Sequence, residues 1–445
     1  MKKDAPSFCV MFNEDLCIGC GICMRVCPTK AIRIRDDRSF RLLDQCVGCG
    51  ECQRVCPSGA IQMQPDKPLT IDRKKISVVI VSPVLFSQFP GEIPVDITAG
   101  LKRMGYDQVI ELSDFLEMFQ FAAETFIRKN RQTREAPWPL ISPVCPVVIR
   151  LIAIRFPGLL SHVLPLKRPV VLLLSDLKQR ISRKFGCKPK DIVVDHITPC
   201  PSKVMTKHSL SAIERKTIDR AFGINSIYAA LFHHMEELET MEIQTFPMDR
   251  PDASISGRCL QWGMSGGEIA GMQIDKSMAI SGVQETINYL EKIELGMFRN
   301  MEYIEFRTCP ESCLGGPLTV IDKYLAKSGV SRLIKIFGMG MNLSGTKLRK
   351  MYDDGYFFSP VDKIRSELVK TFPKKFLSIQ SMQEIDNILE KIRGKNCAVC
   401  GAPDCRTFAE DVVRGESDLE ECIVLRARKC AEDGKDEKQA GKTKR

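Results

Sequence analysis

The sequence predicts a mixed α/β protein: a central α/β domain, a cysteine-rich α+β domain before it, and a small helical cysteine-rich domain after it. Three observations support this organisation. In the middle of the chain, apolar strand-like runs alternate with a helix-like segment, as is typical of α/β domains. Two similar four-cysteine repeats fill the first part of the chain. Four further cysteines lie close together near the end, which indicates a second cysteine-based module.

The domain boundaries follow changes in composition along the 445 residues. We place the first cysteine-rich domain at 1–68, the central domain at 75–375 and the second cysteine-rich domain at 380–430. A chain of this length has room for about two to four domains. Residues 431–445 are charged and lack large apolar side chains, so we expect this tail to be disordered.

Within the central domain, short apolar runs predict the buried strands. DRKKISVVIVSP (72–83), PVVLLL (169–174) and DIVVDHITP (191–199) each read as a strand inside a sheet. DFLEMFQFAAETFIRKN (114–130) has apolar residues at helical spacing and is expected to form an amphipathic helix. The alternation favours a sheet covered by helices.

No segment of the sequence predicts membrane insertion or secretion. No run reaches the roughly 18 uncharged apolar residues that a membrane-spanning helix needs. The first residues, MKKDAPSFCVMFNEDLC, lack an apolar core of signal-peptide length. We therefore expect a cytoplasmic protein, in which clustered cysteines are more often metal ligands than disulfides.

The eight cysteines near the beginning occur in two copies of one motif. Residues 17–28 read CIGCGICMRVCP and residues 46–57 read CVGCGECQRVCP, each with the spacing C-x2-C-x2-C-x3-C-P. This repeat resembles the bacterial two-cluster ferredoxin module, in which the fourth cysteine of each motif binds the other [4Fe-4S] cluster. The resemblance implies one cluster on Cys17, Cys20, Cys23 and Cys56, and a second on Cys46, Cys49, Cys52 and Cys27. A zinc site is the alternative.

The last cysteine block, CAVCGAPDCRTFAEDVVRGESDLEEC (397–422), has the spacing C-x2-C-x4-C-x16-C. It looks like the small four-cysteine [4Fe-4S] domain of the corrinoid iron–sulfur protein and of the Rnf-type electron-transport complex. That resemblance implies that the ligands are Cys397, Cys400, Cys405 and Cys422. CRTFAEDVVRG has helical spacing and should end at Gly415. A structural zinc site on the same thiolates stays open, because spacing separates iron from zinc poorly.

Three short motifs in the central domain carry its remaining clustered cysteines: SPVCP, TPCPSK and CPESCLGG. They resemble the three signatures of the C-terminal domain of the [FeFe] hydrogenase large subunit, and WGMSGGEIAGM (262–272) resembles another stretch of that family. The resemblance implies a [4Fe-4S] cluster on Cys145, Cys200, Cys309 and Cys313. In the family the last cysteine also bridges to a two-iron unit with CO and cyanide. Lys203 matches the lysine that holds a cyanide.

The chain departs from this family where the family moves protons. Its three relay positions correspond here to apolar residues, namely Val144, Phe121 in the best register, and Leu164. A proton relay needs groups that can take up and release a proton within hydrogen-bond reach of one another, which these side chains cannot do. Two family methionines are replaced by Thr198 and Arg307, and two glycines by Glu311 and Ser312.

Arg307 is the replacement with the clearest electrostatic consequence. A fixed positive charge beside the cluster should raise its reduction potential and favour anionic ligands, so we assign Arg307 together with Lys203 to cofactor binding. The alternative for Arg307 is an ordinary salt bridge, and for Lys203 a surface lysine. Four cysteines fall outside every motif and are expected to be structural or incidental, namely Cys9, Cys187, Cys259 and Cys430. We expect the same of His196 and His208.

These patterns favour an iron–sulfur protein of the hydrogenase superfamily with four [4Fe-4S] clusters on 16 of its 20 cysteines. It would transfer electrons, or sense hydrogen or redox state, with its proton relay lost. The alternative is an active ferredoxin-dependent [FeFe] hydrogenase with an altered proton path. Related eukaryotic proteins suggest a cluster-assembly scaffold as a third role. The sequence leaves the two-iron unit open and identifies no catalytic residue.

The expected partner is a redox or signalling protein: a ferredoxin, a flavin oxidoreductase, a kinase or a phosphatase. An anaerobic cytoplasm would suit the oxygen-sensitive clusters of similar proteins. The formal charge of +10 is weak evidence for nucleic-acid binding, because it counts cysteines as neutral. Each oxidised four-thiolate cluster carries about −2, so four of them bring the protein close to neutrality.

Overall fold

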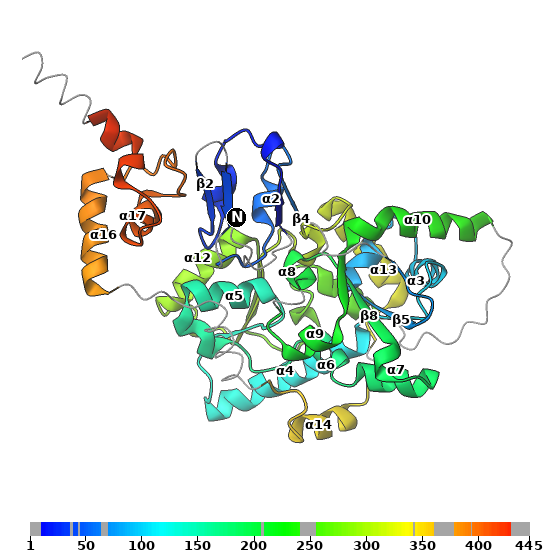
Figure 1. Cartoon of the computed structure of the whole chain (residues 1–445). Coiled ribbons are helices and arrows are strands. Elements are labelled where there is room, and N and C mark those ends of the chain that lie inside the picture. Colours follow the sequence, from blue (N-terminus) through cyan, green and yellow to red (C-terminus); the bar gives the residue numbers. More distant parts are fainter. Residues whose placement is uncertain are drawn as a thin grey trace, which may run out of the picture.

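The computed structural model describes residues 10–35, 39–42, 45–63, 70–205, 209–240, 255–340, 343–359, 378–392 and 394–428. Figure 1 shows a large central body, a small N-terminal body against it, and a C-terminal body beside the N-terminal one. The predicted disordered tail, Cys9, His208 and Cys430 lie outside the described residues. No helix in the described part of the chain is long and apolar enough to cross a membrane.

The N-terminal body is built from two equivalent halves. Strand β1 (Val10–Phe12) pairs antiparallel with β4 (Ile61–Met63), and β2 (Ile32–Arg35) pairs antiparallel with β3 (Ser39–Leu42). The short helices α1 (Ile22–Val26) and α2 (Glu51–Arg54) each begin inside a cysteine motif. Each helix follows a glycine in the left-handed region, with φ of 68° at Gly21 and 74° at Gly50. The repeated sequence therefore gives a repeated local structure.

The central body contains two parallel sheets. The four-stranded sheet has the order β6-β5-β8-β9 and consists of Gln108–Ile110, Ile76–Val81, Ile192–Thr198 and Arg220–Gly223. The three-stranded sheet has the order β10-β11-β7 and consists of Ser277–Ser281, Tyr303–Arg307 and Leu140–Ile141. The predicted strands within 72–83 and 191–199 are confirmed as β5 and β8. Both are almost fully buried, as parallel strands covered on two faces must be.

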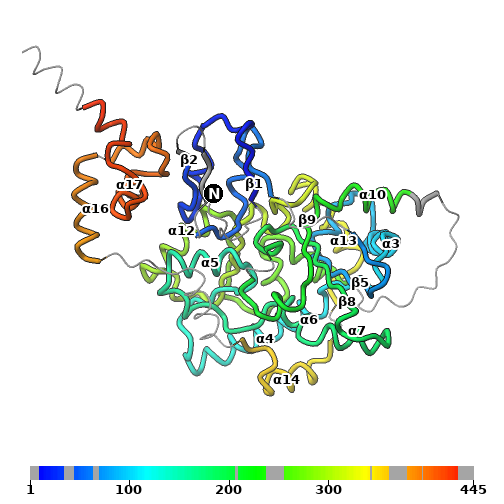
Figure 2. Tube along the Cα trace, in the orientation of Figure 1, coloured from blue at the N-terminus to red at the C-terminus, as the bar shows by residue number. Residues whose placement is uncertain are grey.

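Helices cover these sheets (Figures 1 and 2). The predicted amphipathic helix is confirmed as α4 (Ser113–Thr133). The other α-helices within the described residues of the central body are α3 (Pro94–Arg103), α5 (Pro146–Arg155), α6 (Pro169–Leu174), α7 (Leu177–Phe185), α8 (Pro201–Val204), α9 (Ala212–Thr217), α10 (Ile224–Thr240), α11 (Gly257–Leu260), α12 (Val283–Glu294), α13 (Lys323–Phe337) and α14 (Gly345–Asp353).

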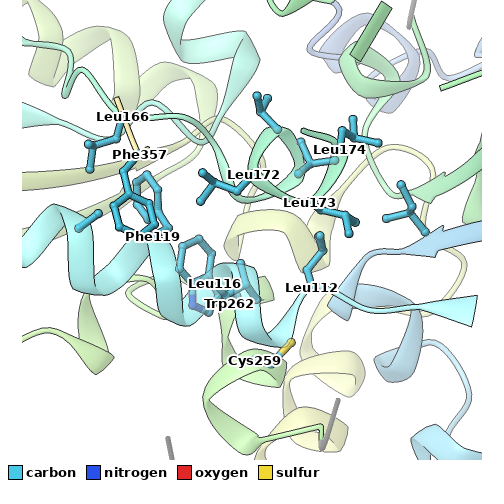
Figure 3. Close-up of a cluster of buried hydrophobic side chains, with 14 of the residues drawn as sticks. Leu112, Leu116, Phe119, Leu166, Leu172, Leu173, Leu174, Cys259, Trp262 and Phe357 are labelled. Atoms are coloured by element: carbon cyan, nitrogen blue, oxygen red, sulfur yellow. The ribbon is translucent and has the colours of Figure 1, made fainter. Parts of the chain in front are cut away.

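The prediction of a strand at 169–174 is wrong, because this segment forms the helix α6. Pro169 occupies the first helical turn, where its missing N–H costs nothing. Every residue of α6 is buried, and its leucines gather with Leu116, Phe119 and Trp262 in the main core (Figure 3). A short run that is apolar on all sides has no period, so the sequence could not separate a buried helix from a buried strand.

The C-terminal body consists of α16 (Ile379–Ile392) packed against α17 (Cys405–Val413). The Asp404 side chain caps α17 by accepting a hydrogen bond from the backbone N–H of Thr407 at 2.8 Å. Gly415, with φ of +69°, follows the end of the helix, which agrees with the predicted helix stop. A core of Ile392, Ala402, Phe408 and Cys422 holds the two helices together.

A buried ion pair attaches the C-terminal body to the N-terminal body. The guanidinium of Arg33 donates two hydrogen bonds to the Asp411 carboxylate, at 2.6 and 2.9 Å. Arg33 is 4% exposed and Asp411 is fully buried. Around this pair, Lys30 binds Asp404 at 2.5 Å, and the Ile34 N–H donates to the Gly401 carbonyl at 3.2 Å.

We predict that Asp411→Ala separates these two bodies, because it leaves the Arg33 charge buried without its partner. Breaking one side of a buried ion pair costs about 3–5 kcal/mol. Hydrogen exchange at the Ile34 amide should rise sharply in this variant. The control is Glu410→Ala on the same helix, whose carboxylate makes only weaker contacts with Arg406 and Arg414, at 3.9 and 3.6 Å. Equal exchange in both variants would contradict the role of the ion pair.

A second prediction concerns Glu111, which directly follows β6. Burial raises the pKa of Glu111 to about 8, although the Ser113 hydroxyl donates to its carboxylate at 2.9 Å. The folded state thus holds this proton more tightly than the unfolded state, so Glu111 lowers stability as pH rises from roughly 4.5 to 8. Glu111→Gln should therefore stabilise the protein more at pH 8.5 than at pH 5, measured as the shift in apparent urea midpoint. The same shift at both values would refute this.

Candidate metal centres

Three loops in the central body bring four cysteines together. Cys145 and Cys200 directly precede helices α5 and α8, each with a proline as the first helical residue. Cys309 follows β11, and Cys313 lies in the 3₁₀ helix η8 (Ser312–Gly315). The loops leave the carboxyl ends of β7, β8 and β11, so parallel strands direct them to one region. The four thiols, called the central set below, line a single cavity of about 30 Å³.

Backbone segments around the central set approach one another so closely that Gly315 and Gly316 have no room for a side chain. A Cβ on Gly315 would lie 2.0 Å from the Pro310 carbonyl oxygen, and one on Gly316 would lie 2.5 Å from that of Pro199. Glu311 and Ser312 adopt left-handed backbone angles, with φ of 54° and 61°. That conformation costs a non-glycine residue about 1–2 kcal/mol. The loop therefore keeps its shape against the preference of its own residues.

Burial alone would keep the central thiols protonated. It raises the pKa of Cys200 to about 11, while nearby Lys203 opposes the rise. Burial also raises the pKa of Cys309, and the neighbouring Cys200, Cys313 and Cys145 raise it further. A metal centre reverses this preference, because a coordinated thiol loses its proton. The chemistry of this donor set fits a cationic iron–sulfur core held by four thiolates.

In the N-terminal body the cysteines group across the two repeats. Cys23 interacts electrostatically with Cys20, Cys56 and Cys17, so the partner from the other motif is its fourth cysteine. Cys49 has the reciprocal neighbours Cys27, Cys52 and Cys46. These groups, called the first and second N-terminal sets, have the same membership as the sets that the ferredoxin resemblance implies.

The cysteines of the C-terminal body form a fourth set. Cys400 interacts electrostatically with Cys397, Cys422 and Cys405. The side chain of Asn396 accepts a hydrogen bond from the Cys405 N–H at 2.9 Å, which fixes the start of α17 next to this loop. Within the described ranges, no group of three or more His, Cys, Asp or Glu side chains lies close enough together to hold a single metal ion. A cubane core spaces its own thiolates apart and does not need such convergence.

The four sets follow one another in space. Cys49 of the second N-terminal set lines the same cavity as the central set. Nearby, the Arg54 guanidinium donates to the Gly315 carbonyl at 2.7 Å. On the other side, Arg25, two residues after Cys23, donates to the Cys397 carbonyl at 3.2 Å. The order is therefore the C-terminal set, the first N-terminal set, the second N-terminal set and the central set.

A second cavity, of about 60 Å³, shares Val144, Lys203, Arg307 and Cys313 with the central cavity. We call it the Cys313 cavity. Arg307 is 2% exposed and forms an ion pair with Glu268 at 2.5 Å, so the salt bridge considered for this residue exists. The same Glu268 carboxylate accepts hydrogen bonds from the hydroxyls of Ser142, at 3.0 Å, and Tyr303.

Sequence reasoning missed Glu268 and Trp262. Glu268 is fully buried and holds Arg307, and Trp262 lines the Cys313 cavity. Both lie in the segment WGMSGGEIAGM. Glu268 is the one acidic residue among its glycines and apolar residues, and this isolated charge could have indicated a buried functional carboxylate. Cys259 is buried in the main core and Cys187 packs at its edge.

Family models match at least part of each cysteine-bearing region. Residues 75–273 match the family described as the iron only hydrogenase large subunit, C-terminal domain. Residues 10–63 match the 4Fe-4S dicluster domain, and residues 394–424 match a family described by its Fe-S cluster. No curated protein matches the chain. The chain is therefore an iron–sulfur protein with hydrogenase-like and ferredoxin-like parts.

Among solved structures, the chain is similar to [FeFe]-hydrogenases. It is 15% identical to an apo variant of HydA1 from Chlamydomonas reinhardtii, with a TM-score of 0.47, covering 68% of this chain and 95% of that one. It is 16% identical to HydA(deltaEFG), a structure of stepwise H-cluster assembly, with the same TM-score and coverage.

The tight loop contacts lead to a third prediction. Gly316→Ala should force the Pro199 carbonyl away and separate Cys200 from Cys313, at a cost of about 1–3 kcal/mol. Gly329→Ala is the control, because it lies in α13 with no atom within 4 Å of its added Cβ. That variant should be neutral or slightly stabilising. Iron retained per chain after anaerobic purification should fall only in Gly316→Ala, and full retention there would contradict the cage geometry.

Proposed function

We propose that the chain is an electron-transfer and redox- or hydrogen-sensing protein with four [4Fe-4S] clusters, one on each set of four cysteines, and that it lacks efficient hydrogen turnover. One observation supports the proposal: residues in or next to each set interact with residues in or next to the following set, from the C-terminal body through the N-terminal body to the central body. In this proposal the clusters are distributed over three domains, at residues 1–68, 75–375 and 380–430.

The side chains suit cubane clusters in each set. Proposed ligands are Cys17, Cys20, Cys23 and Cys56; Cys27, Cys46, Cys49 and Cys52; Cys145, Cys200, Cys309 and Cys313; and Cys397, Cys400, Cys405 and Cys422. When bound, such clusters supply one-electron transfer. The protein residues keep neighbouring sets in contact and exclude water from the central one. Arg307 and Lys203 add positive charge at the central set, which should raise its reduction potential.

The positions of the lost relay support slow or absent hydrogen turnover. Val144 lies at the central set and lines both of its cavities. Leu164 is 1% exposed within the main core, and Phe121 packs against that core. None of these side chains can accept or donate a proton, so a relay through these positions is interrupted.

Partner contact is proposed at the two sets placed first in the order given above, the C-terminal set and the first N-terminal set. Ile18 directly follows the proposed ligand Cys17, and this residue is 65% exposed. Val399 directly precedes the proposed ligand Cys400, and this residue is 63% exposed. Apolar side chains around an exposed cofactor are typical of a contact surface for a redox partner. A ferredoxin, a flavin oxidoreductase, or a signalling kinase or phosphatase would exchange electrons or redox information here.

The experiment for the clusters compares two cysteine variants. Four cubes correspond to about 16 irons per chain, so Cys309→Ser combined with Cys313→Ser should remove about four. The control is Cys187→Ser, which changes a thiol outside every set and should leave iron and sulfide content unchanged. An unaltered iron content in the double variant would mean that the central set holds no cluster.

Hydrogen turnover is tested separately on the intact protein. After anaerobic co-production with hydrogenase maturation proteins, we expect no hydrogen evolution from reduced viologen dye and no exchange between deuterium gas and water. Val144→Cys restores one relay group and should still give little activity, because Phe121 and Leu164 remain. Sustained turnover by the unaltered protein would establish the hydrogenase alternative instead.

A further inference from the structure

The Cys313 cavity carries two buried polar groups without partners. His196 is 3% exposed and its Nδ1 has no hydrogen-bond partner. Trp262 is 5% exposed and its indole Nε1, which can only donate, also has no partner. Both residues line this cavity. A buried unpaired donor costs about 1–3 kcal/mol, so an acceptor inside the cavity would relieve a standing penalty.

The cavity is also electropositive. Three cationic side chains line it, Arg168, Lys203 and Arg307, and no Asp or Glu does among the described residues. Arg168 forms an ion pair with Glu214 and Arg307 forms one with Glu268, each at 2.5 Å, and neither glutamate lines the cavity. Lys203 has no ion pair within the described part of the chain. Burial, together with Lys203 and Arg168, lowers the pKa of His196 to about 3, so this imidazole stays neutral and offers one N–H.

The remaining lining restricts what can enter. Val144, Leu116, Val170 and Val84 form apolar walls. The cavity volume of about 60 Å³ gives room for about four to six water molecules, because one water needs roughly 10–15 Å³ of such space. The buried Arg307 guanidinium lines this space beside Cys313, so a unit of two irons with CO and cyanide would have to share the cavity with a fixed positive charge. We derive no step through that unit.

We propose that the Cys313 cavity is a binding site for one small monovalent anion of about three heavy atoms, such as formate. Lys203, which has no carboxylate partner within the described residues, supplies positive charge, and Trp262 and His196 supply directional hydrogen bonds. The apolar walls cannot replace the water shell of a strongly hydrated anion, so we expect sulfate to be excluded. This inference deepens the proposed function, on which it rests, by naming the ligand that the central cluster would sense.

Anion binding and cluster reduction should oppose one another. Reduction adds one negative charge at the central set, and Cys313 belongs to both the set and the cavity. The reduced protein should therefore hold the anion more weakly. By reciprocity the anion should lower the midpoint potential of the central cluster. A tenfold difference in affinity corresponds to a shift of 59 mV for a one-electron couple.

The test uses azide as the probe, because it is a monovalent three-atom anion with an infrared band outside the protein absorption. Titration of the oxidised, cluster-loaded protein should give one saturable, shifted azide band that formate displaces and sulfate does not. Bands from metal-bound CO and cyanide, after co-production with maturation proteins, would overturn the proposal, because the two-iron unit would then fill the cavity.

Matched variants locate the azide. Lys203→Met removes a charge-assisted contact and should weaken binding about tenfold or more, whereas Lys335→Met on the exposed face of α13 should not. Trp262→Phe removes mainly the N–H donor and should weaken binding about two- to tenfold. Its control is Trp138→Phe, at the other tryptophan of the chain. An azide band that is absent, or unaffected by the Lys203 and Trp262 changes, would refute the site.

The cluster content of each sample separates this proposal from the proposed function. If iron and sulfide show about 16 irons per chain and azide does not bind, the anion site is wrong while the electron-transfer proposal stands. If the central cluster is missing and azide still binds at Lys203, the anion site stands and the electron-transfer proposal fails.

Discussion

The structure depends on one constraint: three strand ends from two parallel sheets must present four thiols to the same small space. The loops that carry Cys145, Cys200 and the Cys309–Cys313 pair can meet only if their backbones approach closely. Gly315 and Gly316 permit that approach. Glu311 and Ser312 adopt the left-handed conformation at an energetic cost, which a folded chain retains only when its surroundings determine the loop shape.

The N-terminal and C-terminal bodies extend this arrangement outward by polar contacts. Arg54 reaches a carbonyl of the central loop, and Arg25 reaches a carbonyl of the C-terminal loop. The Arg33–Asp411 pair then fixes the C-terminal body in place. Buried ion pairs add little net stability compared with apolar packing, but they select one orientation, because any other leaves a buried charge unpaired. Here that orientation places two cysteine sets next to each other.

Local patterns predicted much of this structure. Apolar runs located β5, β8 and α4, and the ferredoxin resemblance implied the grouping of Cys56 with the first motif, which remains a proposal. The all-apolar segment 169–174 was misassigned because it has no period to read. The sequence also could not predict contacts between residues that are far apart along the chain. Asp411 lies 378 residues from Arg33, and Glu268 binds Arg307 through a fold that one sequence does not reveal. The unpartnered nitrogens of His196 and Trp262 are likewise visible only in three dimensions.

The central claim is that every one of the four cysteine sets holds a cubane cluster. The most direct measurement is a Mössbauer spectrum of the full chain, enriched in the Mössbauer isotope and purified without oxygen, together with metal analysis. The account predicts about 16 irons per chain, all in [4Fe-4S] clusters, with no stoichiometric zinc. A stoichiometric zinc, or iron for only two or three cubes in a fully loaded sample, would contradict it and would break the series of adjacent centres on which electron transfer depends.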